Sequence, residues 1–127
     1  MAFDTSKATK TGVPDGDYIG TIVSGEERAN KAGNGRFVHL RWRMDTGAEF
    51  NSYYNIENPN VMAQNIGLAD LKEIQISCGI QPGSGEAEDL VGKVMQVTVE
   101  NKRGSNGREN VNITRYSAIP EGGEIQF

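Results

Sequence analysis

Every second residue from Val38 to Met44 is apolar, and this strict period of two constrains the fold more than any other feature of the chain. The apolar residues of this run are Val38, Leu40, Trp42 and Met44. The residues between and before them are Phe37, His39, Arg41 and Arg43. Because successive side chains of a strand point to opposite faces, the segment predicts a strand from Arg36 to Met44 with one buried and one outward face.

Four further segments have the composition of strands, and turn residues separate them. β-Branched and aromatic residues recur at positions 17–24, 48–56, 94–100 and 109–117. Asn34-Gly35 and Asn106-Gly107 are hairpin signals, the second within a basic loop at 101–108. Sixteen of the 127 residues are glycine, roughly twice the usual share. This excess favours many turns, and we expect residues 25–36 to form a polar connection.

One helix is expected between the third and fourth strands. Asn60 is a candidate N-cap, and apolar residues recur at steps of three and four from residue 61 to 78. Gly67 is a candidate break within this helix. Gly79 stands where a glycine commonly ends a helix.

The element order β-β-β-α-β-β predicts a mainly β fold, a five-stranded OB-like barrel with one helix between strands three and four. Other small α+β domains share this order, so it does not by itself select the barrel. The expected organisation is a flexible N-terminal arm at 1–12, the OB-like domain at 13–117 and an acidic C-terminal tail at 118–127.

The sequence offers little material for an enzyme. His39 and Cys78 are the only residues of their types, and neither a nucleophile-elbow motif nor a phosphate-binding glycine loop is present. The acids Glu86, Glu88 and Asp89 cluster on a Gly/Ser-rich loop, for which a solvated loop is favoured over a metal site. We therefore expect no catalysis, no cofactor and no metal.

A cytoplasmic location is expected from three features. The lone cysteine excludes an intramolecular disulfide and suits a reducing compartment. The first residues carry no apolar signal-peptide core, and no apolar stretch is long enough to span a membrane.

The net charge of −4, from 13 basic and 17 acidic residues, argues against nucleic-acid binding until its distribution is considered. Residues 28–43 hold five basic residues and no acidic one. Residues 100–115 hold four basic and two acidic residues, whereas residues 57–89 hold six acids and one lysine. The basic residues therefore gather on strands two and five and their hairpin loops.

Cations interleaved with aromatic residues on a sheet face are typical of single-stranded DNA binding, where cations follow phosphates and rings stack on bases. The candidate phosphate contacts are Lys31, Arg36, Arg41, Arg43, Lys102, Arg103, Arg108 and Arg115. The candidate stacking residues are Phe37, His39 and Tyr53. The alternative is that Phe37 covers a barrel end while Arg41 and Arg43 solvate the sheet. Trp42 is expected in the core.

The last residues, Glu124-Ile125-Gln126-Phe127, resemble the C-terminal tip of bacterial single-stranded DNA-binding proteins, which ends in Asp-Ile-Pro-Phe. That resemblance implies partner binding by Glu124, Ile125 and Phe127 together with a terminal carboxylate. A glutamine replaces the proline here, and a frayed end or a docked last strand is the alternative.

At larger scale the chain resembles a phage-encoded family of unknown function that is often placed among replication and recombination genes. The matching segments are 14–18, 31–36, 54–60, the helix with Leu71 and Cys78, and 90–93. The resemblance implies an OB-fold protein that binds single-stranded DNA during replication or recombination in the cytoplasm of the infected bacterial host. Self-association, and capture of phage or host replication or recombination proteins by the tip, are further expectations. The alternative is an interaction module that binds a host replication, recombination or defence protein.

Overall fold

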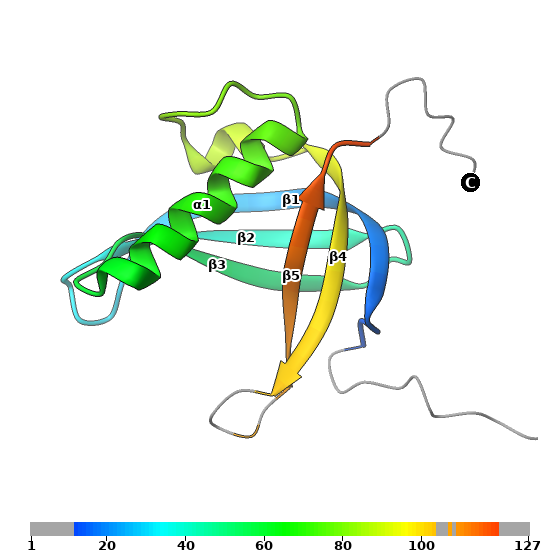
Figure 1. Ribbon diagram of the computed structural model, residues 1–127, viewed down its shortest axis with the longest axis horizontal. Coiled ribbons are helices and arrows are strands. Elements are labelled where there is room, and N and C mark those ends of the chain that lie inside the picture. Colours follow the sequence, from blue (N-terminus) through cyan, green and yellow to red (C-terminus); the bar gives the residue numbers. More distant parts are fainter. Residues whose placement is uncertain (1–11, 104–106, 108, 120–127) are drawn as a thin grey trace, which may run out of the picture.

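The computed structural model describes residues 12–103, 107 and 109–119, and these form five strands, one α-helix and one short 3₁₀ helix (Figure 1). The elements are β1 (Gly16–Ala29), β2 (Arg36–Met44), β3 (Glu49–Glu57), α1 (Val61–Ser77), η1 (Ala87–Leu90), β4 (Val94–Arg103) and β5 (Glu109–Ser117). The mainly β architecture with a helix between β3 and β4 is therefore confirmed. None of the described helices is both long and apolar enough to cross a membrane.

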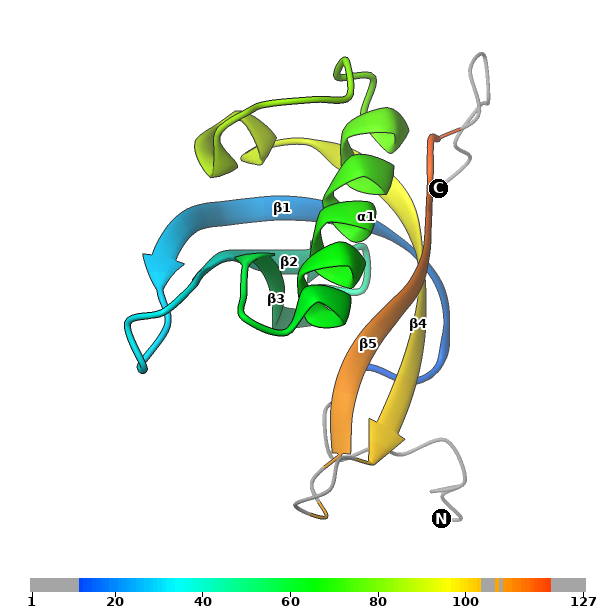
Figure 2. The same cartoon turned by 60° about the vertical axis from the view of Figure 1, so that its left-hand side comes forward.

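The strands form one antiparallel sheet in the order β3-β2-β1-β4-β5. The long strand β1 belongs to both halves of this sheet: residues 16–21 pair with β4, and residues 20–29 pair with β2. An irregularity between Ile22 and Ser24 lets the strand bend. As a result β4 and β5 run across the direction of β2 and β3 (Figures 1 and 2).

The two edges of the sheet are β3 and β5, and within the described residues no ladder joins them. The sheet is therefore not closed into a hydrogen-bonded barrel. Helix α1 packs beside both edge strands (Figure 2). A side-chain contact also crosses the opening, because the hydroxyl groups of Tyr54 on β3 and Tyr116 on β5 lie 2.7 Å apart.

The polar segment from residue 25 was wrongly expected to be a connection, since β1 continues to Ala29. Its residues are polar because this end of the strand is largely exposed, while their backbone groups pair with β2. The loop itself spans Asn30 to Gly35, whose backbone groups are hydrogen-bonded at 2.9 Å. The Asn-Gly pair thus does lie in a hairpin connection, but the connection is wider than a two-residue turn.

Both ends of α1 match the prediction, but Gly67 does not interrupt it. The Asn60 side chain accepts a hydrogen bond from the Ala63 backbone at 3.1 Å, and Gly79 follows the helix with a φ of +80°. Gly67 lies inside the helix, where a Cβ atom would overlap the Asn55 carbonyl oxygen. The glycine is therefore needed for close approach of α1 to β3.

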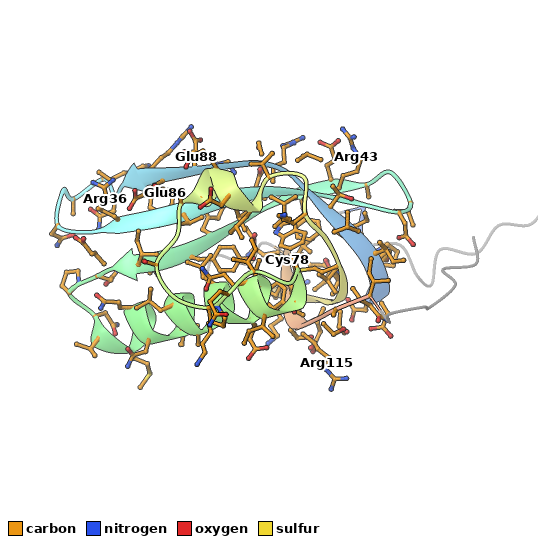
Figure 3. The ribbon with its side chains drawn as sticks, turned by 90° about the horizontal axis from the view of Figure 1, so that it is seen from above. Arg36, Arg43, Cys78, Glu86, Glu88 and Arg115 are labelled. Atoms are coloured by element: carbon orange, nitrogen blue, oxygen red, sulfur yellow. The ribbon has the colours of Figure 1, made fainter. Side chains whose placement is uncertain are left out.

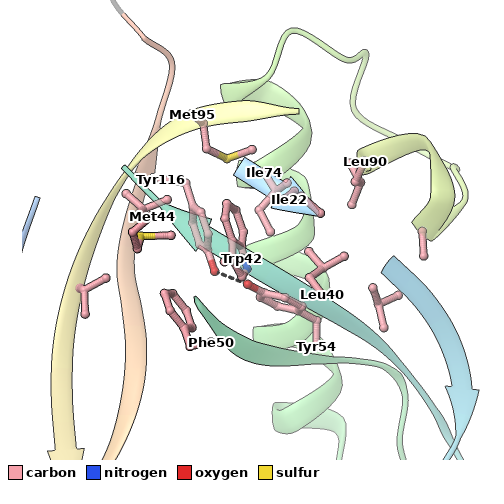
Figure 4. Close-up of a cluster of buried hydrophobic side chains, with 14 of the residues drawn as sticks. Ile22, Leu40, Trp42, Met44, Phe50, Tyr54, Ile74, Leu90, Met95 and Tyr116 are labelled. Atoms are coloured by element: carbon pink, nitrogen blue, oxygen red, sulfur yellow. Dashed lines mark hydrogen bonds between the residues drawn. The ribbon is translucent and has the colours of Figure 1, made fainter. Parts of the chain in front are cut away.

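The alternation in β2 is confirmed, since its four predicted apolar positions are buried. Trp42 is fully buried (Figure 4), and it donates a hydrogen bond from Nε1 to Ser52 Oγ at 2.8 Å. Only part of the apolar pattern of α1 faces the core. Ile74 is buried, whereas Met62 and Ile66 are exposed. The small Gly67 brings a different face of α1 against the sheet.

Candidate nucleic-acid interface

Three neighbouring strands present one outward surface, which we call the outer sheet face. Its residues face solvent opposite the core and pair across the strands in register. The members used below are Glu26, Arg28, Phe37, His39, Arg41, Arg43, Glu49, Asn51 and Tyr53. The ladder places His39 between Glu26 of β1 and Tyr53 of β3.

The three predicted stacking residues meet on this face. The Tyr53 ring is stacked on the His39 ring, with centroids 4.9 Å apart and planes 12° from parallel. Phe37 approaches Tyr53 edge-on at 5.8 Å. Tyr53 is 63% exposed, whereas Phe37 and His39 are half-buried. The Tyr53 ring is therefore open to solvent and is held in place by contacts with the other two rings.

Polar contacts fix the His39 ring beneath Tyr53. Its Nε2 atom lies 2.9 Å from Asn51 Oδ1, and its Nδ1 atom lies 3.4 Å from Glu26 Oε1. These contacts link β2 to β3 on one side and to β1 on the other. The orientation of the aromatic cluster is therefore set by three strands.

The basic residues of the outer sheet face are paired with glutamates of β1 and β3. Arg41 and Arg43 both contact Glu49, each at 2.7 Å, and Arg28 contacts Glu26. Hydrogen bonds from Arg43 and then Arg41 hold the pKa of Glu49 below its ordinary value. The count of five basic residues and no acid in residues 28–43 does not include these partners, because Glu26 and Glu49 lie just outside that segment.

Arg36 does not share the outer sheet face. It has the strand parity of Val38, and its Nε atom lies 3.0 Å from Glu27 Oε1. Figure 3 shows Arg36 and Arg43 at opposite ends of β2. In its place the structure adds Arg28, which lies opposite Phe37 in the ladder.

The other predicted cations lie away from the aromatic cluster. Lys31 is exposed in the β1–β2 loop, and Lys102 and Arg103 are exposed at the end of β4. Figure 3 shows Arg115 on the side of the molecule away from Arg36 and Arg43. Arg108 lies outside the described residues, as do the tail residues Glu124, Ile125 and Phe127.

A groove of about 600 Å³ separates the two edge strands beside this face. It is lined by residues 50–54 of β3, Asp70 of α1, and residues 110–113 and Tyr116 of β5. Tyr53 belongs both to this lining and to the outer sheet face. No local sequence pattern predicts the groove, because its walls come from three separated segments.

The acidic loop after α1 forms local structure. The Glu86 backbone donates to the Asp89 carboxylate at 3.0 Å, which caps η1. Figure 3 shows Glu86 and Glu88 apart from Cys78. In the part of the chain that the structure describes, no three His, Cys, Asp or Glu residues are arranged to hold a metal ion.

Comparison with known proteins adds no relative: no family model matches the chain, and no curated protein matches it.

Proposed function

We propose that this protein binds single-stranded DNA without sequence preference through its outer sheet face. The observation that carries the proposal is the exposed Tyr53 ring, stacked on His39 between Arg41 on one side and Arg28 on the other. An exposed ring supported in this way offers a flat platform for a base. Stacking of one base on an aromatic side chain contributes roughly 1–3 kcal/mol.

The platform favours single strands over duplexes for a geometric reason. The faces of paired bases are covered by their neighbours in a double helix, whereas an unpaired base offers a free face for stacking on Tyr53. Phosphates of the same strand would then lie over Arg28, Arg41 and Arg43. Every base has an aromatic face, so this contact does not select a sequence.

The glutamate partners of these arginines do not prevent phosphate binding. Exposed ion pairs contribute only about 0–1 kcal/mol, and the Arg41 and Arg43 side chains are 45% and 57% exposed. A phosphate can therefore take the place of Glu49 at modest cost. The lysine and arginine of the β4–β5 hairpin, Lys102 and Arg103, supply further charge to an extended strand.

An OB-like barrel is the architecture that we propose for this binding domain. The strand order, the sharing of β1 between both halves and the helix between β3 and β4 support it. The resemblance described above adds the biological setting: phage DNA replication or recombination in the cytoplasm of the infected host. The terminal tip would then recruit partner proteins.

The test is fluorescence anisotropy of a labelled oligo-dT at low and at moderate salt, with an unlabelled duplex as competitor. We expect binding that weakens with salt, because phosphate contacts release counterions. We also expect the duplex to compete poorly. Absence of salt-dependent binding at micromolar protein would refute the proposal.

A further inference from the structure

The groove between β3 and β5 has apolar walls and a polar rim. Its apolar walls include Phe50, Tyr54 and Tyr116, three of the buried core residues shown in Figure 4. Its polar rim includes the exposed side chains of Asn51 and Asn112. A cavity of about 600 Å³ falls within the usual range of small-ligand sites. A ligand that suits this lining is a flat aromatic ring whose faces are apolar and whose edges carry hydrogen-bonding groups.

Asp70 is the one acidic residue in this lining. No other described side chain forms a hydrogen bond or ion pair with its carboxylate. Burial, and after it the charge of Glu73, raises the pKa of Asp70. The groove therefore holds a half-buried acceptor that gains from a hydrogen-bond donor brought by a ligand.

The negative charge of Asp70 disfavours the phosphate of a nucleotide and favours a base that donates a hydrogen bond. A phosphate entering the groove would meet a carboxylate of the same sign and lose its hydration, which is unfavourable. A base edge that carries an amino group would instead donate a hydrogen bond to the carboxylate, as cytosine does through N4. Tyr53 connects the groove to the stacking platform, so a neighbouring base of the same strand can reach it.

We propose that the groove between β3 and β5 receives one base of the bound strand and that Asp70 favours bases with an amino group. This inference rests on the proposed binding of single-stranded DNA. The outer sheet face would bind any sequence, and the groove would add a preference for the chemical class of one base. Cytosine, adenine and guanine carry such a group, and thymine and uracil do not. The ring would pack against the apolar walls while its edge meets Asp70.

The test compares labelled oligo-dC with oligo-dU of equal length at mildly alkaline pH. These pyrimidines have the same ring size and differ in the group at C4 and in the protonation of N3. We expect oligo-dC to bind roughly tenfold more tightly, as a hydrogen bond to a charged group allows. Asp70→Ala should remove this difference while binding of oligo-dU stays the same or strengthens.

Glu73→Ala is the matched control, because Glu73 is exposed on the same helix and its loss changes the net charge equally. This variant should keep the preference for oligo-dC. Asp70→Asn preserves the side-chain shape and serves as the second variant should Asp70→Ala fold poorly; it should reduce the preference.

The outcomes separate the two proposals. If neither oligonucleotide binds, the proposed function fails. If both bind equally to the unmodified protein, or if the Asp70 variants keep the full preference, the groove does not read a base and only this inference is overturned.

Discussion

The hydroxyl groups of Tyr54 and Tyr116 lie 2.7 Å apart and join two edge strands that share no backbone ladder in the described chain. Tyr54 also accepts a hydrogen bond from Ser52 Oγ at 2.8 Å, and Ser52 accepts one from Trp42. Burial raises the pKa of both tyrosines, so both phenols are neutral. This chain of hydroxyl groups links β2, β3 and β5.

The two tyrosines should differ in their contribution to stability. Tyr116→Phe removes the last hydroxyl of the chain and should lower the free energy of unfolding by about 1 kcal/mol. Tyr54→Phe breaks two hydrogen bonds, with Ser52 and with Tyr116, whereas Tyr116→Phe breaks one. Tyr54→Phe should therefore cost about 1 kcal/mol more. Urea denaturation measures both. Tyr18→Phe is the control, because the Tyr18 hydroxyl bonds the Pro14 carbonyl at the surface; equal losses in all three variants would contradict the prediction.

Gly67→Ala should destabilise the protein although alanine favours helices. The new Cβ would overlap the Asn55 backbone, lying 2.5 Å from its nitrogen and closer to its carbonyl oxygen. Because that obstacle is backbone, α1 must move away from β3, at a cost of about 1–3 kcal/mol. Asn65→Ala, at an exposed position of the same helix, should be neutral or stabilising. Stabilisation by Gly67→Ala in thermal unfolding would show that the helix is not held so closely.

Tyr53→Leu should weaken binding of oligo-dT with little effect on folding. Loss of one stacked base corresponds to about 1–3 kcal/mol, or roughly fivefold to 150-fold in Kd. The side chain is 63% exposed, so the thermal midpoint should change little. Met62→Ala removes a similarly exposed side chain on α1 and should leave binding unchanged. Equal anisotropy titrations for Tyr53→Leu and the unmodified protein would remove the platform from the site.

Substitution of the arginines and substitution of Glu49 in their ion pairs should change the affinity for single-stranded DNA in opposite directions. Replacing Arg41 and Arg43 by glutamine should weaken binding and reduce the slope of log K against log salt by about 0.7 per lost phosphate contact. Glu49→Gln should strengthen binding, because a phosphate no longer displaces a carboxylate from either arginine. Lys72→Gln on α1 is a control for net charge. A weaker affinity of Glu49→Gln would mean that Glu49 positions the arginines for DNA.

Acid should weaken the fold in a defined pH range. The pKa values of Glu26, Glu27 and Glu49 are lowered from 4.5, chiefly by hydrogen bonds from Arg28, Arg36 and Arg43 respectively. A lowered pKa in the folded state means that the stabilisation is complete above 4.5 and is lost as pH falls through the folded-state value. Urea denaturation of Glu49→Gln should therefore show a weaker dependence on pH below 4.5 than the unmodified protein shows. An identical dependence would mean that the Glu49 pairs add nothing to stability.

The elements of the fold were predictable because their signals are local. The period of two in β2, the asparagine cap of α1 and the glycine after it each depend on neighbouring residues, and the structure confirms all three. The extension of β1 to Ala29 was missed, because a polar exposed strand has the composition of a loop. Gly67 was misread for a different reason. The glycine is required by the nearby Asn55 backbone of β3, and no local sequence signal reports that contact.

The candidate site was predictable in part. Strand alternation placed Phe37, His39 and Tyr53 on outward faces, and register then brought them together. Alternation also assigns Arg36 to the opposite side of β2, where it pairs with Glu27. Neither Arg28 nor the carboxylate of Glu49 entered the predicted site, because cross-strand neighbours are set by register and not by sequence distance.

The sequence by itself determined the strands, the helix, their order and the side of β2 that faces the core, since these follow from side-chain periodicity and local hydrogen bonds. Only the tertiary structure decided which charges neutralise each other, and that β3 and β5 stand apart with Asp70 between them. The ion pairs of Glu49 depend on the register of β2 against β3, and the separation of the edge strands depends on how β1 bends and how closely α1 approaches β3. Register and the packing of separate elements leave no periodic trace in a single sequence.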